Sequence, residues 1–205
     1  MKSKRTALIV VDVQNDFCPG GALPIPRGDE VIELIEKMIL LVYHRGWEIF
    51  ASRDWHPRKT THFKTHGGAW PEHCVQETYG ADFHPNLLKL RIFATFISKG
   101  TRENEDAYSA FDGMDNSGTP LLELLEEQNV ETIFICGLAT DYCVKATALD
   151  AKRYGLETHL LLDACRAVNL QPDDEEKAVE EMRNAGVVVT TTDELLSSFR
   201  QGEKS

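Results

Sequence analysis

The sequence places five side chains capable of acid–base, nucleophilic or metal chemistry at or just after apolar runs that are typical of β-strands. These side chains are Asp12, Asp54, His56, Lys99 and Cys143. Ligands of open α/β sheets bind outside the carboxyl ends of the strands, so residues at those ends are candidates for a common site. We therefore expect a thiol, an ammonium, two carboxylates and an imidazole to meet at one edge of the molecule.

Cys143 has the sequence context of a nucleophile. It lies at the start of a predicted helix, in the segment GLATDYC at residues 137–143, where the helix dipole and free backbone N–H groups stabilise a thiolate. An ammonium from Lys99 would lower the pKa of this thiol further. Asp12 would take the thiol proton and return it to a leaving group, as acyl transfer requires. A packed cysteine, a solvated lysine and a capping aspartate are the structural alternatives, but their joint position at one edge favours chemistry.

Asp54 and His56 open a histidine-rich stretch that indicates a metal site. The histidines that follow them are His62, His66, His73 and His84. A carboxylate with two imidazoles is a normal shell for Zn²⁺ or another divalent transition ion. Spacing alone does not choose among the histidines. Asp54 and His56 are two residues apart, so both face inward only if the strand has already ended.

The elements that must position these groups alternate between strands and helices. Strands are predicted at residues 6–13, 47–52, 93–97, 131–136, 157–162 and 187–190, and helices at 29–45, 119–128, 142–154, 174–185 and 194–199. The first strand is a nearly continuous apolar run, as expected for a strand buried on both faces. The alternation predicts an α/β fold with a doubly wound, mostly parallel six-stranded sheet and helices on both faces.

The length of 205 residues predicts a single domain over residues 1–205. Two stretches interrupt the alternation, a Gly- and Pro-rich one at 18–28 and a long one at about 54–90. Long loops in compact domains are usually functional, so we interpret the second as an insertion that forms a small loop-rich metal and substrate lobe.

Charge and composition exclude several classes of protein. With 22 Lys and Arg against 33 Asp and Glu, the formal net charge is −11, which argues against a nucleic-acid partner. The longest apolar run, residues 38–43, is too short to span a bilayer, and no signal-peptide pattern opens the chain, so we expect no membrane partner and a cytoplasmic location. The five irregularly spaced cysteines indicate free thiols in a reducing compartment.

Five motifs together resemble the nicotinamidases of the isochorismatase-like hydrolase superfamily. They are VDVQNDFC at 11–18 with Gly20 and Gly21, RDWHP at 53–57, WPEHCVQ at 70–76, SKG at 98–100 and GLATDYCV at 137–144. The resemblance runs from the first strand to the helix that holds Cys143, and the flanking alternation extends it to nearly the whole chain. The WPEHCV stretch and the Asp-x-His pair are its specific parts.

The resemblance assigns a role to each candidate residue. It implies that Cys143 is the nucleophile, Asp12 the general base and acid, and Lys99 the supporting cation. It implies an oxyanion hole made by the N–H groups of Ala139 and Cys143, with a cis peptide preceding Ala139. The residue sets that it implies for the metal and the substrate are Asp54, His56 and His73 for the metal, and Phe17, Trp70 and, more weakly, Tyr108 for the substrate.

Four further residues near these sets need separate treatment. His62 lies eight residues after Asp54, a spacing at which some relatives place an additional ligand and others do not, so its role stays open. We interpret His66 and His84 as non-ligands and Cys74 as a packing residue.

The activity implied by the resemblance is hydrolysis of nicotinamide to nicotinate and ammonia through a cysteine thioester, feeding NAD salvage. The expected cofactor is one divalent metal ion, zinc in preference to iron or manganese, which would orient the substrate. The expected partner is this small molecule. The sequence leaves open whether the chain forms a homo-oligomer and how well it accepts pyrazinamide.

Two alternatives remain at this stage. One is a metal-independent isochorismatase-like hydrolase of another amide, a ureido compound or a vinyl ether. The other is a nucleotide-binding or thiol-based regulatory module on a flavodoxin-like sheet. The second lacks support, because no G-x-G-x-x-G or Walker-type loop follows the first strand and no C-x-x-C is present.

Overall fold

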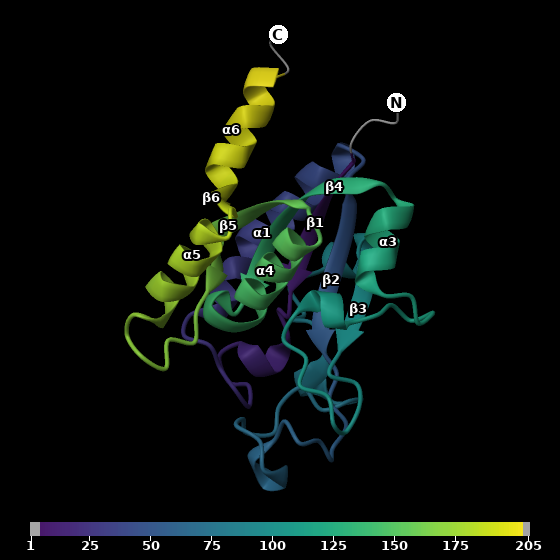
Figure 1. The fold of residues 1–205 in the computed structure, drawn as a ribbon, viewed down its shortest axis with the longest axis vertical. Coiled ribbons are helices and arrows are strands. Elements are labelled where there is room, and N and C mark those ends of the chain that lie inside the picture. The colour runs from purple at the N-terminus through teal and green to yellow at the C-terminus, as the bar shows by residue number, and fades with distance from the viewer. Residues whose placement is uncertain (1–4, 203–205) are drawn as a thin grey trace.

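The computed structural model, drawn in Figure 1, describes residues 5–202 and contains one six-stranded sheet in the order β3-β2-β1-β4-β5-β6. The strands are β1 (Arg5–Val11), β2 (Glu48–Asp54), β3 (Thr95–Lys99), β4 (Val130–Leu138), β5 (Glu157–Arg166) and β6 (Val188–Thr190). All five pairings between neighbouring strands are parallel. The predicted doubly wound α/β fold is confirmed, and the sheet is parallel throughout the described residues.

The central strand β1 is apolar because both of its faces are covered. Its residues Ala7 to Val11 are completely buried, and it pairs with β2 on one side and β4 on the other. The chain runs outward from β1 through β2 to β3, then crosses to β4 and continues through β5 to β6. The strand order therefore reverses between β1 and β4, which is where open α/β sheets form their ligand crevice.

The helices connect the strands over both faces of the sheet. They are α1 (Val31–His44), α2 (Leu90–Phe93), α3 (Leu121–Glu127), α4 (Lys145–Arg153), α5 (Asp174–Asn184) and α6 (Thr192–Gly202). Right-handed crossovers place α1 and α2 on one face and α3, α4 and α5 on the other. In agreement, α1 lies against α2 and α4 lies against α5.

Apart from shifts of one to three residues at helix ends, the helices differ from the sequence prediction in two places. The helix predicted at 142–154 is a π-helical turn (Thr140–Val144) followed by α4, and the short helix α2 was not predicted. The four residues of α2 are too few to show a 3.6-residue hydrophobic period. None of the helices within residues 5–202 combines the length and apolarity that a bilayer span requires.

The segment between β2 and α2 has little regular structure and lies at the carboxyl end of the sheet, at the bottom of Figure 1, opposite α6. Isolated bridges hold it together, pairing His56 with Val75 and Phe63 with Trp70. Phe63 is completely buried among its loops. The segment is therefore packed onto the edge of the sheet where the candidate residues end.

Candidate active site

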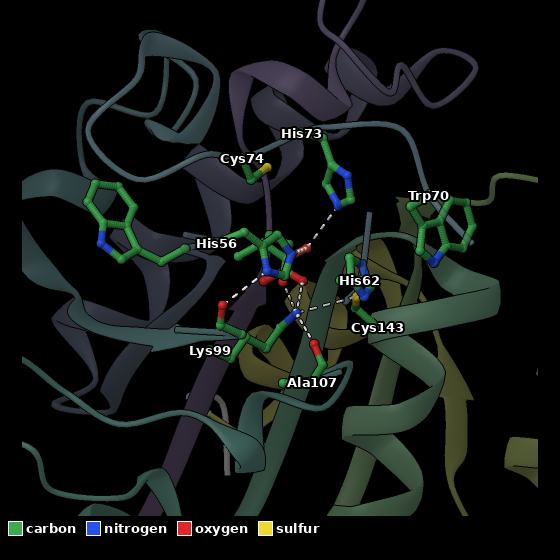
Figure 2. A network of polar contacts seen from close by, with 12 residues as sticks. His56, His62, Trp70, His73, Cys74, Lys99, Ala107 and Cys143 are labelled. Atoms are coloured by element: carbon green, nitrogen blue, oxygen red, sulfur yellow. Dashed lines mark hydrogen bonds and ion pairs between the residues drawn. The ribbon is translucent and has the colours of Figure 1, made fainter. Parts of the chain in front are cut away.

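Lys99 lies at the centre of the site. It ends β3, pairs in register with Asp54 at the end of β2, and is completely buried. Its Nζ lies 2.9 Å from Asp12 Oδ2, bonds Asp54 Oδ1, and donates to Ala107 O at 3.2 Å and to Cys143 Sγ at 3.5 Å. Figure 2 shows these contacts converging on the ammonium. The edge of the sheet thus brings together all three members of the predicted catalytic set.

The charge of this buried lysine is maintained by its neighbours. Burial alone would lower the pKa of Lys99, but the carboxylates of Asp12 and Asp54 outweigh burial and hold that pKa well above its usual range. Burial raises the pKa of Asp54, but the Lys99 ammonium together with His56 and His73 outweighs burial and holds that pKa well below its usual value. Lys99 is therefore a permanent cation between two acids.

Asp12 follows β1 with a positive φ of 50° and is completely buried. Its Oδ1 accepts a hydrogen bond from Ser52 Oγ at 2.6 Å. Among the described residues, Oδ2 has no hydrogen-bond partner beyond its ion pair with Lys99. Burial raises the pKa of Asp12, with Lys99 opposing the rise and Asp54 adding to it. Such a carboxylate is a better proton acceptor than an exposed aspartate.

Cys143 is buried in the π-helical turn, and oxygens of Asp12 and Asp54 lie within 4.8 Å of its sulfur and of each other. The expectation of a lowered pKa for this thiol is wrong. Burial raises the pKa of Cys143 well above its usual value, because desolvation and the two carboxylates outweigh the Lys99 ammonium. A raised pKa favours the protonated thiol, so a nucleophile at this position would need a base to remove its proton.

The turn before Cys143 has the backbone geometry that the resemblance implied. The peptide bond between Leu138 and Ala139 is cis. The Ala139 carbonyl accepts N–H bonds from Tyr142 at 3.1 Å and Val144 at 3.0 Å, which close the turn around Cys143. Before this turn, near the end of β4, Gly137 has a φ of +116°, and a Cβ there would lie 2.1 Å from the Val11 carbonyl oxygen. Only glycine lets β4 approach β1 this closely.

A pocket of about 430 Å³, counting the space at its open mouth, leads to Cys143. Its lining includes the three predicted substrate residues, Phe17, Trp70 and Tyr108, and also Ala139. Trp70 Nε1 donates to the Tyr108 hydroxyl at 2.9 Å. The rest of the wall includes Leu23, Ile25, Leu138, Tyr142 and Val168. An apolar, aromatic pocket with a polar floor fits a flat ring that carries one reactive polar group.

Three histidines gather beside Asp54. One imidazole nitrogen of each of His56, His62 and His73 lies within 4.8 Å of the others, and all three side chains are buried. Asp54 Oδ2 lies 3.6 Å from His56 Nε2 and 3.7 Å from His73 Nε2. Both Asp54 and His56 face inward because β2 ends at Asp54.

The donor set of this cluster fits a divalent metal ion. Three neutral imidazoles and one carboxylate are ordinary ligands for a transition ion. His56 Nε2 is buried, and among the described residues it has no hydrogen-bond partner, which is costly unless something else binds it. Burial and the nearby His56 lower the pKa of His62, which favours the neutral form that ligates.

The remaining candidates are not members of this cluster. His66 is exposed, and His84 Nδ1 accepts from the Asn86 N–H at 3.3 Å. Cys74 is buried and its N–H donates to Asp16 Oδ2 at 2.7 Å. All five cysteines lie within the described residues and are buried and free. These positions agree with the interpretation of His66 and His84 as non-ligands and of Cys74 as a packing residue.

The structure adds residues to the site that the sequence did not assign. His62, left open from spacing, lies with His56 and His73. Tyr142 lines the pocket, and its ring centroid lies 5.0 Å from that of Trp70. The sequence signal that could have identified Tyr142 is its position directly before Cys143. Asp106, which bonds His62 Nδ1, lies in a polar loop with no motif around it.

Comparisons with known proteins agree with this geometry. The family model of the isochorismatase domain matches residues 6–194. A nicotinamidase/pyrazinamidase of Mycobacterium tuberculosis is 42% identical over 186 residues, covering 88% of this chain and 96% of the relative. A nicotinamidase of Escherichia coli is 39% identical over 201 residues, covering 90% and 94%. A crystal structure of the Pyrococcus horikoshii pyrazinamidase in complex with zinc superposes with a TM-score of 0.83 at 45% identity, covering 91% of this chain and 99% of that one.

Proposed function

Since the chain belongs to the isochorismatase family, we propose that it hydrolyses nicotinamide to nicotinate and ammonia through a cysteine thioester. One observation carries the proposal beyond the likeness itself: a buried thiol, carboxylate and ammonium meet at the end of an aromatic pocket. This set matches the needs of amide hydrolysis, in which a nucleophile must be deprotonated and an amine must be protonated. The nicotinate formed would feed NAD salvage.

The first half of the proposed reaction uses Asp12 and Cys143, whose oxygen and sulfur atoms lie within 4.8 Å of each other. Asp12 takes the proton of Cys143 as the sulfur attacks the carboxamide carbon, and the carbonyl electron pair moves to oxygen. The N–H groups of Ala139 and Cys143 hold this oxyanion in our assignment; losing one such donor typically costs about 2.7–4 kcal/mol. Asp12 then gives its proton to the amide nitrogen and the C–N bond breaks. Ammonia departs, and the acyl group remains on Cys143 as a thioester.

The second half reuses the same carboxylate. Asp12 takes a proton from water, whose oxygen attacks the thioester carbon, and the C–S bond breaks as the sulfur regains a proton from Asp12. Lys99 keeps its charge throughout, 2.9 Å from Asp12 Oδ2 and 3.5 Å from Cys143 Sγ. It stabilises the thiolate and the carboxylate in turn.

The metal site that we propose consists of Asp54, His56 and His73, with His62 as a further ligand. Zinc is the ion that we assign first, with iron or manganese as alternatives, because borderline ions favour imidazole with carboxylate. When bound, the ion would supply a Lewis-acidic contact for the ring nitrogen of the substrate. Asp54 would thereby join the two halves of the site, since its other oxygen bonds Lys99.

The pocket walls would hold the ring in line with the thiol. Phe17 and Trp70 are the stacking residues in this proposal, and Tyr108 fixes the Trp70 indole through its hydroxyl. We also propose that residues 1–205 form one domain in which residues 54–90 are the metal and substrate lobe. The continuous cluster of buried apolar side chains that includes residues of both the sheet and this segment supports one domain.

Ammonia release tests the function. The purified protein should release ammonia from nicotinamide and from its pyrazine analogue, and Cys143→Ala should abolish release while the bound metal stays at the wild-type level. Cys165→Ala, which alters another buried thiol, 2% exposed, is the matched control and should retain activity. Appreciable turnover by Cys143→Ala would overturn the covalent mechanism. Ammonia release from a ureido compound but from neither nicotinamide nor its pyrazine analogue would overturn the assignment of the substrate.

A further inference from the structure

The three clustered imidazoles share one pattern of hydrogen bonding at Nδ1. His56 Nδ1 lies 3.0 Å from Gly100 O, and His73 Nδ1 lies 2.7 Å from Pro71 O. His62 Nδ1 bonds the carboxylate oxygen Oδ1 of Asp106. An oxygen of a carbonyl or carboxylate only accepts, so each Nδ1 carries the proton and each Nε2 is left as a bare lone pair. All three rings are thus held in the tautomer that ligates through Nε2.

His62 differs from the other two rings in the charge of this outer partner. His56 and His73 donate to backbone carbonyls, whereas His62 donates to an anion. Charge-assisted hydrogen bonds are about twice as strong as neutral ones. A carboxylate behind a ligating imidazole also increases its basicity and fixes the orientation of its ring.

Asp106 belongs to residues 100–108, here called the bridging segment, which touches each part of the site. Its Glu103 carbonyl accepts the Thr61 N–H at 2.8 Å, and its Ala107 carbonyl accepts from Lys99 at 3.2 Å. The Tyr108 hydroxyl at its end accepts from Trp70 Nε1. The carboxylate of Asp106 is therefore carried on a segment already fastened to the catalytic lysine, the pocket wall and the His62 loop.

We propose that Asp106 is a positioning residue that holds His62 in the metal-binding orientation. This inference rests on the metal site proposed above. The His62 side chain is 5% exposed and that of Asp106 is 62% exposed, so an exposed carboxylate acts on a buried ligand. The His62 ring stacks on His56 with centroids 4.6 Å apart and an interplanar angle of 24°. Without Asp106 the ring loses the partner that selects its tautomer and is free to turn about that stack.

The backbone around His62 is held independently of Asp106. The His62 N–H donates to Thr60 Oγ1 at 3.2 Å, and its carbonyl accepts from the Trp70 N–H at 3.3 Å. A substitution at the exposed Asp106 should therefore change the orientation of one ring and leave the fold intact. The intact fold is checked by thermal unfolding, in which the metal-free wild type and the metal-free Asp106 variant should have the same Tm.

The test is titration of Zn²⁺ and Co²⁺ into metal-stripped protein by calorimetry and absorption. Asp106→Ala should weaken metal affinity by about 10–100-fold, the usual range for a lost outer partner, and should alter the Co²⁺ d–d bands. Asp106→Asn keeps an acceptor oxygen without the charge and should recover part of this loss. Glu103→Gln removes an equal charge from the same segment and should bind metal like wild type.

A double-mutant cycle with His62→Ala decides whether Asp106 acts through His62. In the His62→Ala background Asp106→Ala should have no further effect on metal affinity. Wild-type affinity in Asp106→Ala, or an equal loss in both backgrounds, would overturn the inference while leaving the proposed activity standing. A wild-type protein that binds neither ion would instead overturn the metal site itself, and the inference with it.

Discussion

A substitution at Ser52 should change the pKa of the proposed base, Asp12, while Asp12 itself is left in place. Ser52 lies in β2 opposite Val11, is completely buried, and donates from Oγ to Asp12 Oδ1 at 2.6 Å. A second link, from the Asp12 N–H to the Ser52 carbonyl at 3.1 Å, belongs to the backbone and survives substitution. Ser52→Ala therefore removes one hydrogen bond from the carboxylate and leaves the strand pairing in place.

The size of the effect follows from this bond. A hydrogen bond to a charged group contributes about 1.5–3 kcal/mol, and one pKa unit corresponds to about 1.36 kcal/mol, so its loss corresponds to about 1–2 units. Burial raises the pKa of Asp12 and the Ser52 hydroxyl lowers it. Ser52→Ala should therefore raise the pKa of Asp12 further, so that the base is protonated, and inactive, at a higher pH than in wild type.

The assay is the pH dependence of kcat/KM for ammonia release at saturating metal. The acidic limb should move up by about 1–2 pH units. The free energy of unfolding should fall by about 1.5–3 kcal/mol, which is about 3–12 °C in Tm for a chain of this size. Ser98→Ala in β3 is the matched control. Ser98 Oγ accepts a hydrogen bond from Arg53 Nε at 2.9 Å, so this substitution removes a comparable bond that does not involve Asp12.

Two results would refute the reasoning. An acidic limb at the wild-type position in folded Ser52→Ala would mean that Asp12 is not the group whose protonation stops the reaction. An equal shift in Ser98→Ala would mean that any loosened bond in the sheet moves the profile, so that the Ser52 bond has no specific role.

Three further substitutions test the metal lobe. His73→Ala removes a nitrogen 3.7 Å from Asp54 Oδ2 and should weaken both metal retention and substrate affinity, measured by metal analysis and KM; a fully active, metal-free variant would contradict the assignment. Gly100→Ala adds a Cβ 2.4 Å from His56 Cε1 at a φ of +63°, so metal affinity and denaturant stability should both fall, and unchanged values of both would refute the proposed close fit. Phe63→Ala removes a fully buried ring whose centroid lies 5.4 Å from that of the His56 ring, and it should lower the free energy of unfolding by about 3–5 kcal/mol. A loss under about 1 kcal/mol would show that the lobe collapses around the cavity.

The central strands β1 and β4 were predictable because they are buried on both faces. A completely buried run such as Ala7 to Val11 has to be apolar along its whole length. The end of β4 was less accessible to sequence reasoning, since it continues to Leu138 through the glycine that packs on Val11. Tertiary contact, rather than local preference, sets that boundary.

The pKa of Cys143 shows where local reasoning fails. Its place at a strand-to-helix turn and a neighbouring lysine both argue for a lowered pKa. Burial has the larger effect and the opposite sign, and two carboxylates add to it. Burial depends on everything packed around the sulfur, which no segment of sequence describes.

The sequence by itself determined which groups reach the edge of the sheet. A parallel α/β alternation sends the carboxyl ends of all strands to one edge, so Asp12, Asp54, Lys99 and Cys143 had to arrive there together. Only the tertiary structure decided which of the following histidines meet, which partner holds each ring, and which way the thiol titrates. Lys99 and Cys143 are 44 residues apart, as are His62 and Asp106. Such contacts depend on how loops without periodic patterns pack, and the folded chain alone defines their distances and their shielding from water.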